Sequence, residues 1–373
     1  MSSLIPYFTF HFQHTSFLLQ ANAPVYYLIK AALVLTLFAI SLGVAAYATY
    51  GERKIAALMQ DRVGPNRAGP LGLLQPIADG VKMIMKEEMT PNISNKFLFI
   101  LGPSIAMLTA CMTGVVIPFG KEIWIQGKPV DLQVADINIG ILYLLGVVSL
   151  GVYGIMIGGW ASNNKYSLLG ALRASSQMIS YEIAMGLAII ALVMVSGSLS
   201  LKDIAASQNH VWNIVYQPIG FLIFIVCAFA ECNRAPFDLP ECETELVGGY
   251  HTEYSSMKLG FYLFAEYINM FISSAVMATL YFGGYQIPFA DVMGLSGNVL
   301  AIAGVLFLFT KIFFFIFLFM WVRWTIPRFR FDQLMNLGWK KLIPLALLNI
   351  LVTGVVIMRH EIFNVAAWKA LFH

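Results

Sequence analysis

Four ionisable residues lie inside long apolar stretches of the sequence, where they could take part in acid–base or electrostatic chemistry. Glu182 and Lys311 lie well inside two such stretches, and Glu231 and Glu266 lie nearer the ends of two others. An ionisable group at membrane depth is costly unless it faces a polar cavity or another such group. Buried carboxylates can exchange protons near neutral pH, so these acids are candidates for proton handling. The alternative for Glu182 and Lys311 is a buried ion pair without a transport role, and for the other two acids an interfacial anchor.

The segment that begins at Glu231 holds the densest group of acids. Up to Lys258 it contains six acids and one arginine, namely Glu231, Asp238, Glu241, Glu243, Glu245, Glu253 and Arg234. Neighbouring carboxylates oppose one another's ionisation, so such a group should respond to nearby charge. The prolines at 236 and 240 and the glycine pair at 248–249 favour a shaped, packed loop over an ordinary solvated acidic one.

A second polar segment begins with the Glu-Arg-Lys triplet at 52–54. Residues 62–70 are too rich in glycine and proline for regular structure, and residues 71–86 then place apolar side chains on one helical face and polar ones on the other. Because lysines lie on the polar face, we expect this helix to lie in the plane of the membrane interface. It is either a surface anchor or one wall of an entrance for a lipid-like ligand.

The sequence carries no recognisable redox centre, metal site or nucleotide site. Its four cysteines, at 111, 227, 232 and 242, form no C-x-x-C pair and match neither an iron–sulfur nor a zinc spacing. The sequence contains neither the G-x-G-x-x-G motif of dinucleotide-binding folds nor the G-x-x-x-x-G-K-[ST] motif of P-loop proteins. A net charge of +3 without a basic run also argues against nucleic acid as a partner. We therefore expect this chain to bind no metal or cofactor of its own.

The elements that must position these residues are membrane helices. Only 12% of the 373 residues are charged, 59% are hydrophobic and the mean hydropathy is +0.74, whereas ordinary globular chains are about 25% charged. Apolar stretches long enough to cross a bilayer lie near 26–50, 97–119, 139–160, 176–198, 215–232, 259–283, 299–322 and 342–360. We predict an all-α polytopic membrane protein with about eight transmembrane helices, organised as an N-terminal segment 1–25 and a single transmembrane domain 26–373.

The distribution of cations predicts the orientation of these helices. Of the 23 Lys and Arg residues, 16 fall in the first, third, fifth and seventh loops and five fall on the opposite side. The positive-inside rule therefore places the N-terminus outside and the odd-numbered loops inside. The even loops, such as 120–138 and 284–298, look like plain connectors, so we expect function at the inner face.

Two long motifs and several shorter ones resemble a single known family. They are RVGPNRAGPLGLLQP at 62–76 and AECNRAPFDLPECETELVGGYHTEYS at 230–255, supported by ERK at 52–54, ISYEIAMG at 179–186 and RWTIPRFRFDQLM at 323–335. They resemble the membrane-embedded H subunit of respiratory complex I, the NADH–quinone oxidoreductase of the respiratory chain. The likeness covers nearly the whole chain, although Cys232 stands where many members of that family carry Thr.

The resemblance implies a quinone channel coupled to proton translocation. By position, Arg53, Arg62 and Asp79 correspond to residues of the quinone channel or its entrance. The acids that correspond to the path between quinone chemistry and the proton-pumping subunits are Glu182, Glu231, Asp238, Glu241, Glu243 and Glu245. Quinone is then the substrate, and the iron–sulfur clusters and FMN belong to partner subunits, as do the residues that bind the quinone headgroup.

The same resemblance implies partners and a location. Redox-arm subunits would cover the inner loops, other membrane-arm subunits would pack laterally, and lipid would surround the rest. The chain would lie in the inner membrane of a bacterium with its N-terminus on the periplasmic side. One alternative is the related membrane subunit of an energy-converting hydrogenase. A second alternative is a stand-alone ion antiporter that uses Glu182 and Lys311, but the inverted repeat typical of such transporters is not visible in the sequence. A third is a purely structural anchor for a soluble complex.

Overall fold

Eight apolar helices form the frame of the described part of the molecule. The computed structural model describes residues 23–125, 128–209, 211–239, 243–288 and 297–362, and within them seven helices are long and apolar enough to cross a membrane. They are α2 (Ala23–Met59), α4 (Lys96–Thr113), α5 (Gly140–Ala161), α6 (Lys165–Ser196), α11 (Ser256–Tyr281), α12 (Gly297–Thr325) and α14 (Ile343–Ile362). A shorter apolar helix, α9 (Pro218–Glu231), is the eighth. The predicted all-α polytopic fold is confirmed, and residues 1–22 of the predicted N-terminal segment lie outside the described residues.

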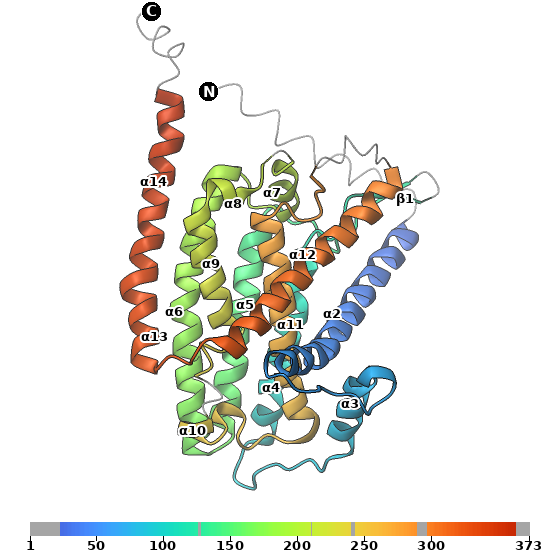
Figure 1. Cartoon of the computed structure of the whole chain (residues 1–373), viewed down its shortest axis with the longest axis vertical. Coiled ribbons are helices and arrows are strands. Elements are labelled where there is room, and N and C mark those ends of the chain that lie inside the picture. Colours follow the sequence, from blue (N-terminus) through green and yellow to red (C-terminus); the bar gives the residue numbers. More distant parts are fainter. Residues whose placement is uncertain (1–22, 126–127, 210, 240–242, 289–296, 363–373) are drawn as a thin grey trace, which may run out of the picture.

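Shorter elements connect these helices at both ends of the molecule. Those near the lower end in Figure 1 are η1 (Pro70–Gly72), α3 (Gln75–Met85), α10 (Glu243–Leu246), η3 (Gly249–His251), α13 (Phe331–Leu337) and the π-helical turn η4 (Gly338–Leu342). Those near the upper end are η2 (Gly114–Val116), the antiparallel strands β1 (Ile123–Ile125) and β2 (Lys128–Val130), α7 (Leu201–Ser207) and α8 (Asn213–Tyr216). In the strand pair Ile123 lies opposite Val130.

Helix α11 lies at the centre of the arrangement. It contacts α2, α4, α9 and α12, and its lower end contacts α3. Figure 1 shows α14 against α6 on one flank and the tilted pair α2 and α12 on the other. The start of α2 and the end of α14 lie at the same, upper end, as an even number of crossings requires. The four odd-numbered loops, which hold most of the cations, consequently share the lower end.

Helix α9 is short because the chain is interrupted at Gln217 and Pro218. Proline has no N–H with which to continue a helical hydrogen-bond ladder, so α8 ends and α9 begins there. A helix of 14 residues spans about 21 Å, less than the roughly 30 Å of a hydrocarbon core, so polar groups at its end need partners inside the protein. The side chain of Gln217 meets this need, because it donates to Thr353 Oγ1 (2.8 Å) and accepts from Asn349 Nδ2 (2.9 Å).

Helix α6 begins at Lys165 instead of near residue 176 as the hydropathy indicated. Its first turns contain polar side chains, which lower the hydropathy, but Ser167 and Gln177 are buried against the rest of the protein. Glu182 therefore lies near the middle of α6, further from the start of the helix than the hydropathy indicated.

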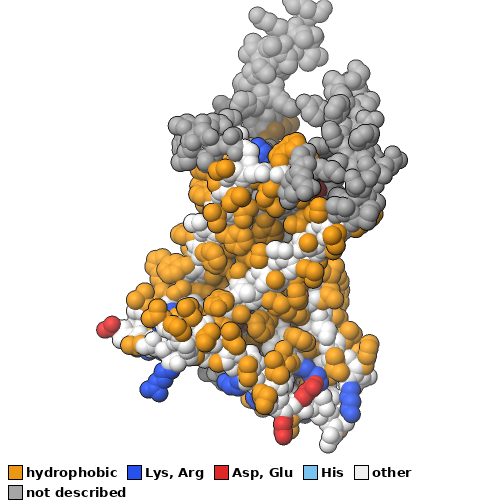
Figure 2. Space-filling model, turned by 90° about the vertical axis from the view of Figure 1, so that its right-hand side faces the viewer, with side chains coloured by type: hydrophobic (Ala, Val, Ile, Leu, Met, Phe, Trp, Pro, Cys, Tyr) orange, Lys and Arg blue, Asp and Glu red, His pale blue; other side chains and the backbone are white. Residues whose placement is uncertain are grey.

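Charge and apolar surface are separated along the molecule. Figure 2 shows hydrophobic side chains over the middle of one face and charged side chains gathered at the lower end. This pattern fits a protein whose middle lies in lipid. The opposite flank, formed by α14, is apolar as well, because large hydrophobic residues such as Leu348, Leu351 and Val355 are exposed there.

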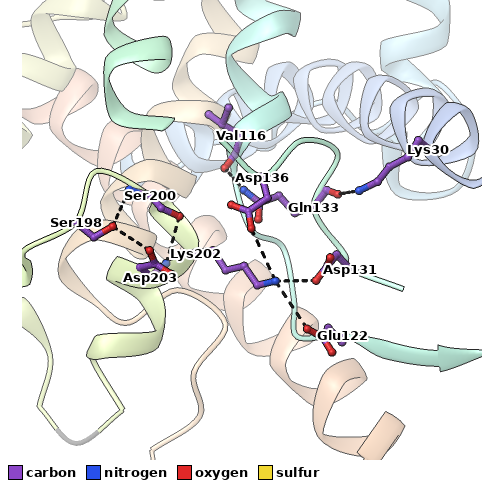
Figure 3. Close-up of polar contacts among 10 residues, drawn as sticks. All are labelled: Lys30, Val116, Glu122, Asp131, Gln133, Asp136, Ser198, Ser200, Lys202 and Asp203. Atoms are coloured by element: carbon purple, nitrogen blue, oxygen red, sulfur yellow. Dashed lines mark hydrogen bonds and ion pairs between the residues drawn. The ribbon is translucent and has the colours of Figure 1, made fainter. Parts of the chain in front are cut away.

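The upper end carries a charged cluster of its own. Lys202 at the start of α7 points toward three acids of the 120–138 connector (Figure 3): Nζ lies 2.8 Å from Asp131, 3.8 Å from Glu122 and 4.0 Å from Asp136. The pKa of Lys202 is affected by burial, which lowers it, but the hydrogen bond to Asp131 and the surrounding acids outweigh this and raise it above the usual lysine value. The connector that was expected to be plain is thus held by a partly buried cation.

Candidate functional site: a charged path from a pocket to a buried cavity

A pocket with a volume of about 290 Å³ lies between α2, α3, α11 and α12, and we call it the α2–α3 pocket. Its polar lining comes from Thr49, Glu52, Arg53, Asp79, Tyr267 and Arg323. Apolar and small side chains complete the walls, among them Ala46, Met83, Leu263, Phe264 and Trp324. The pocket therefore combines apolar walls with charged groups that come from α2, α3 and α12.

Helix α3 forms one wall of this pocket, and its amphipathic pattern explains why. Pro76, Asp79 and Met83 line the pocket, while the apolar residues Ile77, Val81, Ile84 and Met85 are exposed on the outside. The amphipathic helix predicted over 71–86 is observed as η1 followed by α3. It is attached to the start of α11 because Ser256 Oγ donates to the Met83 carbonyl oxygen (3.0 Å).

The three residues predicted for the entrance are not all in the pocket. Arg53 Nη1 lies 2.8 Å from Asp79 Oδ2, and this ion pair joins α2 to α3 at the pocket wall. Asp79 also accepts a hydrogen bond from Gln75 (3.1 Å). Arg62 is exposed in the following loop, where its Nε donates to Gln60 Oε1 (2.7 Å), and it does not line the pocket.

Glu52 is the buried acid of the pocket, with 6% of its surface exposed. Its carboxylate accepts hydrogen bonds from Arg323, from Tyr267 Oη (2.8 Å) and from Arg234 Nη1 (3.5 Å). These three partners come from α12, from α11 and from the loop after α9. Glu52 thus joins the pocket to the interior of the protein.

Arg234 continues from Glu52 toward the interior. Its Nη2 lies 3.8 Å from Glu266 Oε2, and its guanidinium carbon lies 4.1 Å from the centre of the Tyr267 ring. A buried guanidinium needs acids and an aromatic face around it to offset the loss of hydration. Glu266 in turn accepts a hydrogen bond from Tyr250 Oη (3.1 Å). We call this chain of contacts, from Arg323 through Glu52, Arg234 and Glu266 to Tyr250, the charged path.

The loop after α9 is shaped by backbone contacts that bring Arg234 inward. Asn233 has a positive φ of 48°, and Phe237 N donates to the Arg234 carbonyl oxygen (2.9 Å) to close a tight turn. Gln177 of α6 donates to the carbonyl oxygens of Ala230 (2.8 Å) and Phe237 (2.9 Å) on both sides of that turn. The shaped, packed loop predicted from its prolines is therefore observed over its described residues.

The charged path ends at a buried cavity of about 40 Å³, enough for roughly two or three water molecules. We call it the buried cavity. Its polar lining consists of Thr109, Thr113, Glu231, Asn233, Tyr250, Tyr262, Glu266, Asn269 and Ser273. Two carboxylates therefore face one small polar space inside an otherwise apolar bundle.

Beyond the cavity, Glu231 lies close enough to Glu182 for their charges to interact. Glu231 is buried, whereas Glu182 is only partly buried and accepts a hydrogen bond from Ser149 of α5. Glu182 thus stands at the side of the bundle, between α5 and α6. Lys311 has different partners, because it donates to backbone carbonyl oxygens after α11. The contacts described for Glu182 and Lys311 therefore do not join them into one ion pair.

The acids of the 231–253 segment do not form one cluster. Asp238 is half-buried in the loop, Glu245 lies 2.6 Å from Arg173 at the surface, and Glu253 accepts from Asn164 (2.6 Å). Glu243 begins α10, and Glu241 lies outside the described residues. The described acids are thus distributed among different partners, with Glu245 beside Arg173 within α6 and Glu253 beside Asn164 at the start of α6.

The sequence does not mark Glu52, Arg323 and Tyr267 as site residues, although Glu52 and Arg323 lie within two of the family motifs. Each lies near a helix end or beside other charges, so its hydropathy signal resembles that of an interfacial anchor. The sequence signal that could have indicated this site is the presence of one acid, Glu52, and two arginines, Arg234 and Arg323, just after the ends of three apolar stretches. Among the described residues, no group of three or more His, Cys, Asp or Glu side chains could hold a metal ion.

Comparisons with known proteins agree over nearly the whole chain. A family model described as NADH dehydrogenase matches residues 31–354. An H subunit of the NADH-quinone oxidoreductase of Cytophaga hutchinsonii is 68% identical over 337 residues, which cover 90% of this chain and 98% of that protein. The corresponding H subunit of Flavobacterium johnsoniae is 60% identical, with 89% and 96% covered, and that of Leptospira biflexa is 48% identical, with 91% and 96% covered.

Proposed function

The chain belongs to the H-subunit family of NADH-quinone oxidoreductase, a family of multi-pass membrane subunits of complex I, and we propose that its α2–α3 pocket is where quinone passes between the bilayer and the enzyme. The observation that carries this proposal is the pairing of apolar walls with buried charge in one pocket. A quinone has an apolar tail and a polar headgroup. The walls suit the tail, and the hydrogen-bonding groups of Arg53, Asp79 and Tyr267 suit a passing headgroup.

The charged path would couple quinone chemistry to the membrane arm. Reduction of a quinone to a quinol takes up two electrons and two protons and passes through states with added negative charge. Such charge near Arg323 and Glu52 would disturb the balance of the path, because charges interact strongly where water is scarce. Arg234, Glu266 and the buried cavity would pass the disturbance to Glu231.

Glu182 would transmit the electrostatic change from this chain to a neighbouring subunit. It lies on the side of the bundle within the apolar region and is only partly buried. An ionisable side chain in that position calls for a polar partner. We therefore place a neighbouring membrane-arm subunit against α5 and α6, with the lower loops covered by redox-arm subunits that carry the iron–sulfur clusters and FMN.

The orientation of the chain follows from its cations. The lower end holds the odd loops and most Lys and Arg residues, so we place it at the cytoplasmic side of a bacterial inner membrane. The N-terminus then lies on the periplasmic side. The hydrogenase subunit and the stand-alone antiporter are not favoured, because the relatives above are named as subunits of NADH-quinone oxidoreductase.

Filling the α2–α3 pocket tests its role. Gly80 of α3 lines the pocket, and a Cβ atom there has no neighbour within 4 Å, so a bulky side chain can enter the pocket without clashing at its base. In the assembled enzyme, Gly80→Trp should lower kcat/KM for a long-chain quinone by about tenfold, which corresponds to about 1.4 kcal/mol.

The matched control is Gly43→Trp, because Gly43 of α2 is half-buried like Gly80 and has no neighbour within 4 Å of its Cβ position, but lies outside the pocket. NADH oxidation with a water-soluble artificial acceptor measures how much enzyme has assembled. Equal quinone kinetics in the two variants, at equal assembly, would show that quinone does not use this pocket.

A further inference from the structure

Lys311, near the middle of α12, lies in a cage of backbone carbonyl groups. Its Nζ donates to the carbonyl oxygens of Phe282 (2.7 Å), Gly284 (2.7 Å) and Gln286 (3.3 Å). The ammonium group also lies 4.3 Å from the centre of the Phe307 ring and 5.2 Å from that of Trp212. Three acceptors match the three N–H donors of a primary ammonium ion, and the rings add cation–π attraction.

The carbonyl groups of this cage follow directly after α11 ends at Tyr281. The last turn of a helix leaves carbonyl oxygens without helical partners and carries partial negative charge. Gly283 and Gly284 have positive φ values of 72° and 53°, a conformation that glycine adopts easily, and they turn the chain so that its carbonyl groups converge on Lys311.

Other side chains close the rest of this helix end. Gln208 donates to the Thr279 carbonyl oxygen (2.9 Å) and accepts from Gly283 N (2.9 Å), and Asn213 donates to the Leu280 carbonyl oxygen (3.0 Å). These two side chains are neutral, whereas Lys311 brings a full positive charge. Lys311 therefore places its positive charge at the C-terminal end of α11, where the helix carries a partial negative charge.

We propose that Lys311 is a positioning residue, whose ammonium group is the counter-charge that joins α12 to the end of α11. Near its C-terminal end α12 presents Arg323 to Glu52, twelve residues or about 18 Å further along the helix than Lys311. The two cations thus hold α12 at two points and set where Arg323 stands beside the α2–α3 pocket. Only the activity readout of this proposal rests on the proposed function.

An emptied cage should bind a free ammonium ion. Lys311→Ala removes the side chain but leaves the carbonyl groups and the two rings, so methylammonium can take the place of the lost group. Lys311→Met keeps a chain of similar length without charge and leaves the cage filled. Lys311→Arg keeps the charge, but a planar guanidinium does not match a three-acceptor cage.

The test uses the assembled enzyme in mild detergent at pH 7, with methylammonium chloride or an equal concentration of tetramethylammonium chloride, which has no N–H donor. Lys311→Ala should lower the melting temperature of the complex by about 5 °C. The same variant should raise KM for quinone, because Arg323 is then no longer held beside the α2–α3 pocket. Methylammonium should restore at least half of the loss in melting temperature and should also lower this KM. Tetramethylammonium should restore neither, and neither salt should help Lys311→Met.

Lys30→Ala is the control for removing another lysine within a span, since Lys30 donates to the Gln133 carbonyl oxygen at the upper end of α2. It should show no specific response to methylammonium. A wild-type melting temperature for Lys311→Ala, or the same methylammonium response in Lys311→Ala and Lys311→Met, would overturn the proposal. If methylammonium restores the melting temperature of Lys311→Ala while Gly80→Trp leaves the quinone kinetics unaltered, the role of Lys311 is supported and the quinone role of the pocket is refuted.

Discussion

Removing Arg234 should destabilise the protein far more than removing a surface arginine with a shorter ion pair. Arg234 lies 3.5 Å from Glu52 and 3.8 Å from Glu266, and the side chains of all three are less than 10% exposed. At an effective dielectric constant of about 20, each contact is worth roughly 4–5 kcal/mol before desolvation is subtracted. Loss of one partner from such a buried group costs about 3–5 kcal/mol, because Glu266 is left charged in the interior.

The comparison variant is Arg173→Met. Arg173 lies only 2.6 Å from Glu245, but the two side chains are 31% and 51% exposed, so the loss should be about 1 kcal/mol or less. The assay is the unfolding free energy of the purified chain in mixed micelles. Arg234→Met should lose at least about 2 kcal/mol more than Arg173→Met, and Arg234→Met combined with Glu266→Gln should recover most of that loss. If Arg173→Met is as destabilising as Arg234→Met, distance and not burial governs these pairs, and the buried charged path is refuted.

Three further predictions concern Glu231, the upper end and the helix packing. Glu231→Gln should keep NADH:quinone reductase activity but lower the number of protons moved per NADH in proteoliposomes; unchanged proton stoichiometry in Glu231→Gln would remove this residue from the coupling. Lys202→Met should lower the melting temperature at pH 7–9. Because the folded-state pKa of Lys202 is raised, the charged side chain contributes its full stabilisation below the ordinary lysine pKa. This stabilisation disappears as the pH rises through the folded-state pKa. The melting temperatures of wild type and Lys202→Met should therefore converge at high pH, and a difference that grows with pH would contradict the sign. Gly158→Ala should cost about 1–3 kcal/mol, because its Cβ would lie 1.9 Å from Tyr262 Oη, whereas Gly146→Ala, with open space around it, should be neutral or stabilising.

Local patterns in the sequence were sufficient for the helices. Eight apolar stretches predicted eight helices, because a chain in lipid must satisfy its backbone hydrogen bonds within each crossing segment. The amphipathic period over 71–86 likewise predicted α3, because the 3.6-residue repeat is a property of the segment alone. Helix ends were less predictable: Lys165 starts α6 although the hydropathy begins near 176, since one face of the first turns, which includes Ser167, is buried against other segments.

The site depended on contacts that hydropathy does not encode. Arg53 and Asp79 were both selected from sequence, yet only the fold shows that they pair at 2.8 Å while Arg62 stays apart. Glu182 and Lys311 looked alike as charges within spans, but one lies beside Ser149 and the other closes the end of α11. Identical local signals led to different environments because the partners come from other helices.

The sequence by itself determined the class of protein, its membrane helices and its family, because hydropathy, cation placement and long loop motifs are all properties of consecutive residues. Only the tertiary structure decided which charges form one connected path. Glu52, Arg234, Glu266 and Arg323 come from three helices and a loop, and they meet because α11 packs against α2, α9 and α12 at one depth. In a medium where an unpartnered charge is so costly, that packing selects the partner of each charged group.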